Sequence, residues 1–155
     1  MTTRLVLPLV ALMLAVGCGV GTYRAGQVTG EMQMRLVAER SGEPVGRWFS
    51  DEVLGLEEVV FLDASHVREA HLEERPDGAR HIVLHLTADG ADRLAEATRV
   101  HQGRRLAIVV DGRIVAAPTI REPITTGEAH ITVDGDIDQV FDALTRAGNS
   151  PATEP

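Results

Sequence analysis

Residues 83–121 read VLHLTADGADRLAEATRVHQGRRLAIVVDGRIVAAPTIR, and this stretch decides the fold. The stretch begins within residues 81–87, where Ile82, Leu84 and Leu86 face one side and the residues between them face the other. This alternation is typical of a strand. Thr87 can then cap a helix. Small and apolar residues follow at the i, i+3, i+4 and i+7 spacing of a helix face: Ala91, Leu94, Ala95 and Thr98. The stretch therefore predicts a strand followed by a helix, which Gly103 should end.

The residues after that helix predict a hairpin. Residues 106–110 are apolar on both faces, which is typical of a strand at the centre of a sheet. Asp111-Gly112 comes next, and this dipeptide is a strong signal for a two-residue hairpin turn. We therefore expect residues 113–117 to form the returning strand.

The flanking sequence supplies the rest of the fold. The strand that begins the main stretch covers residues 81–87, and alternating or short apolar runs predict further strands at residues 32–38, 59–62, 70–74 and 129–133. Asp136 can cap a second helix that Gly148 closes. Runs of strands with two helices indicate an α+β fold. We expect a mainly antiparallel mixed sheet with the two main helices packed on one face.

The N-terminus has the layout of an export signal. Arg4 is followed by an almost wholly apolar run at residues 5–16, which suits a signal peptide and is short for a bilayer-spanning helix. The small residues before Cys18 resemble a bacterial lipobox, so we expect Cys18 to be lipidated and to anchor the chain to a membrane. An uncleaved anchor and an ordinary cleaved signal are the alternatives. All three place the domain in the cell envelope, facing the periplasm or the exterior.

These patterns divide the chain into four segments. We expect a lipoprotein signal peptide at 1–17, a flexible glycine-rich tether at 18–30, a folded domain at 31–148 and a disordered tail at 149–155.

Composition narrows the class of protein. The chain has 155 residues, enough for one domain. Its net charge of −8, with no basic cluster, disfavours nucleic acid as a partner. Aromatic residues make up only 3%, so the core must be built from aliphatic side chains.

The stretch 83–121 closely resembles the head subdomain of the first periplasmic domain of SecD, a protein-export subunit. The matching features are Gly90, Thr98, residues 105–109, Asp111-Gly112 and Ala117-Pro118. The resemblance extends over residues 31–148 and implies a head domain that holds an emerging polypeptide. SecD also has a base subdomain and membrane helices. This sequence has no counterpart for them, so we expect no proton-driven movement from it alone.

No group of residues predicts an enzyme. There is no G-x-S-x-G motif, and Cys18 is assigned to the anchor. His81 and His85 share one strand face but lie ~13 Å apart along it, too far for one zinc ion without a ligand between them. A surface metal site near His66 and His71 is the alternative. We expect no catalytic residue, no cofactor and no metal.

A binding face is the remaining kind of site. An apolar strip on the open side of the sheet could accept an extended peptide. The residues expected on this face are His81, Val83, His85, Ala107 and Val109. The alternative is that the segment 48–59 covers them. We therefore expect a membrane-tethered protein that binds polypeptides as an accessory to export. The alternative function is an envelope scaffold or regulatory lipoprotein with one folded partner.

Overall fold

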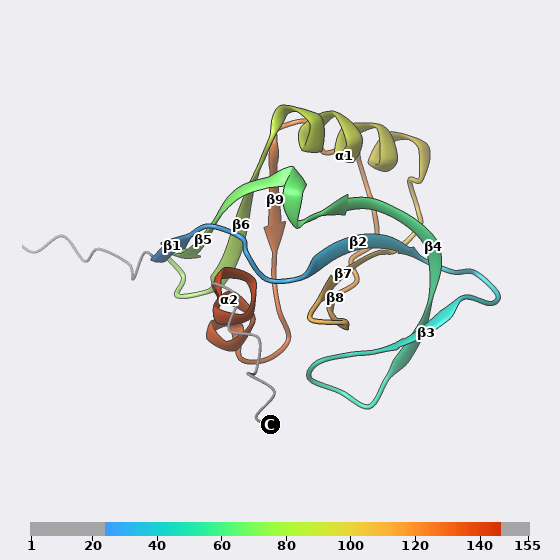
Figure 1. Ribbon diagram of the computed structural model, residues 1–155, viewed down its shortest axis with the longest axis horizontal. Coiled ribbons are helices and arrows are strands. Elements are labelled where there is room, and N and C mark those ends of the chain that lie inside the picture. The colour runs from blue at the N-terminus through green and yellow to red at the C-terminus, as the bar shows by residue number, and fades with distance from the viewer. Residues whose placement is uncertain (1–23, 147–155) are drawn as a thin grey trace, which may run out of the picture.

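The computed structural model describes residues 24–146, which form two antiparallel sheets and two main helices (Figure 1). The four-stranded sheet has the order β1 (Arg24–Gly26), β5 (Val67–Glu74), β6 (Arg80–Leu86) and β9 (Glu128–Ile131). The five-stranded sheet has the order β3 (Glu43–Gly46), β4 (Val53–Asp63), β2 (Met32–Val37), β7 (Leu106–Val110) and β8 (Arg113–Ala116). The α+β class is confirmed. The strands are divided between two sheets where the sequence suggested one.

The five-stranded sheet curls until its two edges meet. Just beyond β3, Arg47 forms a parallel bridge with Ile114 of β8. The Trp48 N–H donates to the Ile114 carbonyl at 2.9 Å. The face enclosed by this curl carries a small aliphatic cluster of Val45, Leu56, Ala107, Val109 and Ile114. The sheet is thus closed into a small barrel with an apolar lining.

The strand, helix and hairpin predicted for residues 83–117 are all present. Helix α1 spans Ala88–Val100, and the Thr87 hydroxyl accepts the Gly90 N–H at 3.1 Å. Asp111 and Gly112 have φ of 47° and 71°, the left-handed values that a two-residue hairpin of this kind requires. Strands β6 and β7, on either side of α1, belong to different sheets. Helix α1 therefore carries the chain from one sheet to the other.

Helix α2, Ile137–Thr145, closes the fold on the other side (Figure 1). Its cap is Asp136, as predicted, whose carboxylate accepts the Gln139 N–H at 3.2 Å. A short 3-10 helix, η1 (Ala64–His66), joins β4 to β5.

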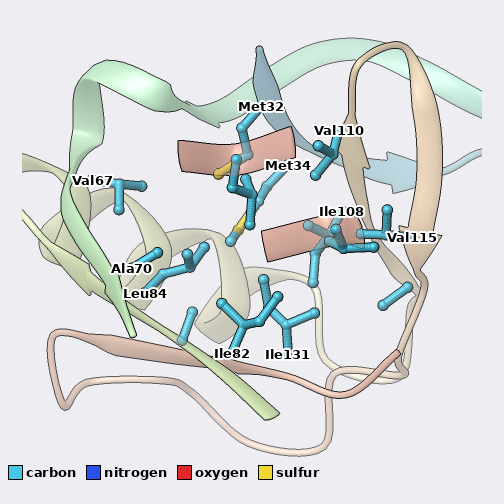
Figure 2. Close-up of a cluster of buried hydrophobic side chains, with 14 of the residues drawn as sticks. Met32, Met34, Val67, Ala70, Ile82, Leu84, Ile108, Val110, Val115 and Ile131 are labelled. Carbon is cyan, nitrogen blue, oxygen red and sulfur yellow. The ribbon is translucent and has the colours of Figure 1, made fainter. Parts of the chain in front are cut away.

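The main core lies between the two sheets. Figure 2 shows Met32, Met34 and Val110 of the five-stranded sheet above Leu84 and Ile82 of the four-stranded sheet. Leu94 of α1 and Leu144 of α2 are buried in the same cluster, at 1% and 0% exposure. Both helices therefore pack against the core that the sheets share, and aliphatic residues dominate it as the composition indicated.

The prediction of a flexible tether at residues 18–30 is wrong from Arg24 onward. Residues 24–26 form β1, which pairs with β5. The Gly30 N–H donates to the Leu144 carbonyl at 2.9 Å. A Cβ on Gly30 would lie 2.1 Å from the Ala143 carbonyl oxygen. This glycine therefore serves close packing against α2 and not flexibility. The expected signal peptide (1–17), Cys18 and the expected tail (149–155) lie outside the described residues.

Candidate functional site

The five residues expected on one binding face are separated by the structure. His81, Val83 and His85 lie on the side of β6 opposite the core-facing Ile82 and Leu84, which is the outer face of the four-stranded sheet. Ala107 and Val109 line the barrel of the other sheet and are 0% and 6% exposed. The prediction of a single five-residue face is therefore wrong.

The reason is that β7 pairs with β2 and not with β6. The curl of the five-stranded sheet then encloses the side of β7 that carries Ala107 and Val109. Leu54 and Leu56 pack in the same cluster. The alternative that the segment 48–59 covers the predicted face is thus confirmed for these two residues.

The outer face of the four-stranded sheet carries a concentration of histidine and glutamate, here called the histidine face. Its members are Glu69, His71, Glu73, His81, Val83, His85, Glu128 and His130. Val83 is at its centre, paired with His71 on one side and with His130 on the other. Val83 is only 2% exposed. The apolar residue on this face is therefore covered, and polar rings and carboxylates are what the face offers.

Two histidines of this face are in direct contact. His85 Nε2 lies 3.0 Å from His71 Nδ1. The other nitrogen of each ring faces a carboxylate: His71 Nε2 is 3.3 Å from Glu69 Oε2, and His85 Nδ1 is 3.3 Å from Glu128 Oε1. Glu73 Oε1 lies 3.9 Å from His71 Nδ1. Negative charge therefore surrounds the pair.

A second pair of rings lies beside the first. His81 stacks on His130, with ring centroids 5.3 Å apart. Burial lowers the pKa of His81, and the positive charge of Arg75 and of His130 adds to this effect. The Nδ1 atom of His81 is buried without a hydrogen-bond partner among the described residues. Because burial disfavours the charged form, His81 is held toward its neutral form.

A groove of a different character lies between β4 and α1. The pairing of β3 with β4 ends at Leu56. Beyond it, β4 is paired only with β2 among the described strands. Residues 59–61 of this strand line one groove together with residues of α1, and the Phe61 ring lies 5.5 Å from that of His101, which follows α1. An unpaired strand edge of this kind can accept another strand.

The lining of this groove, here called the β4–α1 groove, is largely apolar. It consists of Val59, Val60, Phe61, Asp92, Arg93, Glu96, Ala97, Val100 and His101. Val59, Val60 and Val100 are 57%, 39% and 56% exposed. Clustered exposed valines on two elements are unusual for a surface that has no partner. The groove therefore combines free backbone groups with apolar contact area.

Sequence reasoning found part of the histidine face and missed the groove. The alternation within residues 70–74 and 129–133 could have placed His71 and His130 on outer faces, but the pairing between strands was needed to bring them to His85 and His81. His66 lies elsewhere, with Nδ1 2.8 Å from Asp63 Oδ1, so the expected alternative of a joint site with His71 is not formed. Within residues 24–146, neither helix has the length and apolarity needed to cross a bilayer.

Comparison with known proteins gives a consistent result. The model of the SecDF P1 head subdomain matches residues 35–143. SecD of Acidaminococcus fermentans is 30% identical over 102 residues, and SecD of Treponema pallidum is 41% identical over 71 residues. These alignments cover 64% and 46% of this chain but only 24% and 12% of the relatives. A solved structure described as a membrane component SecDF that enhances protein export superposes with a TM-score of 0.61 at 25% identity. That superposition covers 77% of this chain and 62% of the other.

Proposed function

This chain belongs to the SecDF P1 head subdomain family, and from that premise we propose that it binds unfolded polypeptides through the β4–α1 groove as a non-enzymatic accessory to protein export. The observation that supports this most directly is the free edge of β4 beside exposed Val59 and Val100. A chain that has not yet folded exposes apolar side chains and unpaired backbone groups, and the groove is complementary to both. Strand addition supplies backbone hydrogen bonds without regard to sequence, which suits many different clients.

The test is a binding titration with a reduced, unfolded and fluorescently labelled protein. The Val59→Glu and Val100→Glu substitutions place charges in the groove. Burying one valine contributes about 1.5 kcal/mol, which is roughly a tenfold change in affinity. We therefore expect the double variant to bind about 100-fold more weakly than the unsubstituted chain.

Val53→Glu is the matched control. Val53 is on the same strand and 59% exposed, close to the 57% of Val59, but it lies outside the groove. We expect this variant to bind like the unsubstituted chain. Unchanged binding by the groove variant, or an equal loss in the control, would contradict the proposed site.

The alternative function, a scaffold with one folded partner, predicts a different cross-linking pattern. A photoreactive amino acid at Val59 in the native membrane should capture many different chains if the groove holds export clients. One discrete product would favour the alternative.

We also propose that Cys18 carries the membrane anchor and that the domain faces the periplasm or the exterior. Cys18 follows Ala15-Val16-Gly17 after an apolar run, the layout of a lipobox. Metabolic labelling with palmitate should mark the chain, and Cys18→Ser should abolish the label. A label that survives this substitution, or no label on the unsubstituted chain, would favour one of the unlipidated alternatives.

A further inference from the structure

A cavity lined by residues of both sheets is not used by the proposed polypeptide binding. It has a volume of about 360 Å³, and its lining combines residues of β7, β8 and β9 with Arg47 and Arg105. We propose that this cavity, here called the arginine cavity, binds the carboxylate of a ligand whose body is small and apolar. The inference is independent of the proposed function, because no residue lines both the arginine cavity and the β4–α1 groove.

The deep part of the arginine cavity is apolar. Ile108, Ala116 and Ile131 line it and are 4%, 8% and 1% exposed. Thr132 and Asp134, which also line it, are exposed and lie toward solvent. The volume is at the lower end of the range for small-molecule sites. The cavity therefore suits a ligand with an aliphatic body of a few carbon atoms and a polar group beside it.

Arg105 supplies a positive charge without a carboxylate partner. Its Nε donates to the Ala117 carbonyl at 3.1 Å, which fixes the half-buried side chain against the end of β8. The terminal nitrogens Nη1 and Nη2 make no hydrogen bond or ion pair with any of residues 24–146. A partly buried charge without a partner is unfavourable, and a carboxylate matches the planar fork of a guanidinium. Arg105 is therefore the main partner that the cavity offers to an anion.

Arg47 adds a second guanidinium that is already held in position. Its Nη1 donates to Glu52 Oε2 at 2.8 Å. Its Nη2 has only a loose contact, 3.9 Å from Asp134 Oδ2, and the Asp134 side chain is 93% exposed. The pKa of Glu52 is lowered by its hydrogen bond with Arg47 and also by the positive charges of Arg47 and Arg105. One carboxylate thus responds to both guanidiniums, which places the two charges in the same region.

The balance of charge favours a carboxylate over a phosphate. Among the described residues that line the cavity, Asp134 is the only one with a carboxylate. Arg47 shares its charge with Glu52 and Asp134, so the excess of positive charge comes mainly from Arg105. A single unpaired guanidinium neutralises one negative charge and not two. A monoanion with an apolar body therefore fits both the charge and the lining.

The experiment is a titration of the full chain in detergent with sodium butyrate, followed by the backbone amide signals in nuclear magnetic resonance spectra. We expect saturable shifts of the Arg105, Ala117 and Ile131 signals in the millimolar range. Butyramide has the same body without the charge and should leave these signals unchanged. The signals of Val59 and Val100 in the β4–α1 groove should not move with either compound. No saturable shift with butyrate, or equal shifts with butyramide, would overturn the proposal.

Three variants locate the anion. Arg105→Gln should weaken butyrate binding at least about tenfold, because it removes hydrogen bonds to a charged group. Arg40→Gln removes the same charge from an exposed arginine outside the cavity and should leave the affinity unchanged. Equal affinities of these two variants would refute the site. Asp134→Asn removes a repelling charge at an exposed position and should strengthen binding about twofold. It tests the site if circular dichroism shows that Arg105→Gln is unfolded, and unchanged or weaker binding would then contradict the proposal.

The carboxylate could belong to a free organic acid or to the C-terminus of a polypeptide. N-acetylvaline represents a C-terminal residue, and its amide is the uncharged control. Tighter binding of N-acetylvaline than of butyrate would identify a polypeptide C-terminus as the source, and the reverse order would identify a free acid. Equal binding of N-acetylvaline and its amide would refute recognition of the carboxylate.

Discussion

A substitution at Gly30 tests whether residues 24–30 pack against helix α2. The Gly30→Ala substitution would place a Cβ 2.1 Å from the Ala143 carbonyl oxygen and 3.2 Å from that of Leu144. A carbon and an oxygen normally approach no closer than about 3.2 Å, so the segment would have to move by about 1 Å. That movement would break the bonds from the Thr29 and Gly30 N–H groups to the Leu144 carbonyl, now 3.0 and 2.9 Å.

The expected cost follows from those two bonds. Each backbone hydrogen bond contributes about 0.5–1.5 kcal/mol net, and residual overpacking adds about 1 kcal/mol. We therefore expect the free energy of unfolding to fall by about 2–4 kcal/mol. Urea denaturation of the full chain, followed by circular dichroism, measures it.

Gly46→Ala is the matched control, because a Cβ at Gly46 would meet no atom within 4 Å. Alanine within a strand is preferred to glycine by about 0.5–1 kcal/mol. This variant should be as stable as the unsubstituted chain or slightly more stable. If both variants unfold at the same urea concentration, the packing of residues 24–30 against α2 does not occur in solution, and these residues form the tether that the glycine content suggested.

Three further substitutions test the core, a buried hydroxyl and a surface ion pair. Leu94→Ala should lower the free energy of unfolding by about 2–5 kcal/mol, because Leu94 is 1% exposed and the truncation leaves a cavity. Urea denaturation measures this change, and a loss below about 1 kcal/mol would mean that α1 is loosely packed. Thr98→Val should cost about 1–3 kcal/mol in the same assay, since the Thr98 hydroxyl accepts the Ile124 N–H at 2.9 Å and valine leaves that N–H unpaired; no loss would argue that water replaces the hydroxyl. Asp138→Asn should cost about 0.5 kcal/mol near pH 7 after allowance for solvent screening, because the Arg80 guanidinium lowers the pKa of Asp138, whose side chain is 45% exposed. A lowered pKa stabilises the fold above the unfolded value of about 3.9 and ceases to do so as the pH falls through the folded value. The difference between the Asp138→Asn variant and the unsubstituted chain should therefore shrink as the pH falls below the unfolded value of about 3.9. A difference that does not shrink with falling pH would contradict an electrostatic origin.

Local patterns in the sequence were sufficient for the individual elements of the main stretch. Thr87 as a helix cap, the apolar spacing through Leu94 and the Asp111-Gly112 turn each depend on residues within a few positions of one another. Their physical causes are hydrogen bonds and backbone conformations that one short segment satisfies by itself. The prediction for these residues was therefore confirmed element by element.

Strand pairing was decided only in the tertiary structure. Val83 and Val109 occupy similar apolar strands in the sequence, yet Val83 lies at the centre of the histidine face and Val109 lines the barrel. An alternating pattern tells which residues share a face of one strand, but it does not tell which strand lies alongside. The tether was wrongly predicted around Gly30 for the same reason. Gly30 packs against Ala143 of α2, which lies far away in the sequence.

Both proposed sites belong to that second category. The arginine cavity joins residues of β7 and β8 with residues of β9, which belongs to the other sheet, and the β4–α1 groove depends on β3 ending its pairing at Leu56. The sequence by itself determined where the strand, helix and hairpin of residues 83–117 form, since these arise from neighbouring residues. The tertiary structure alone decided which side chains meet across the sheets, because those contacts join residues far apart in the chain.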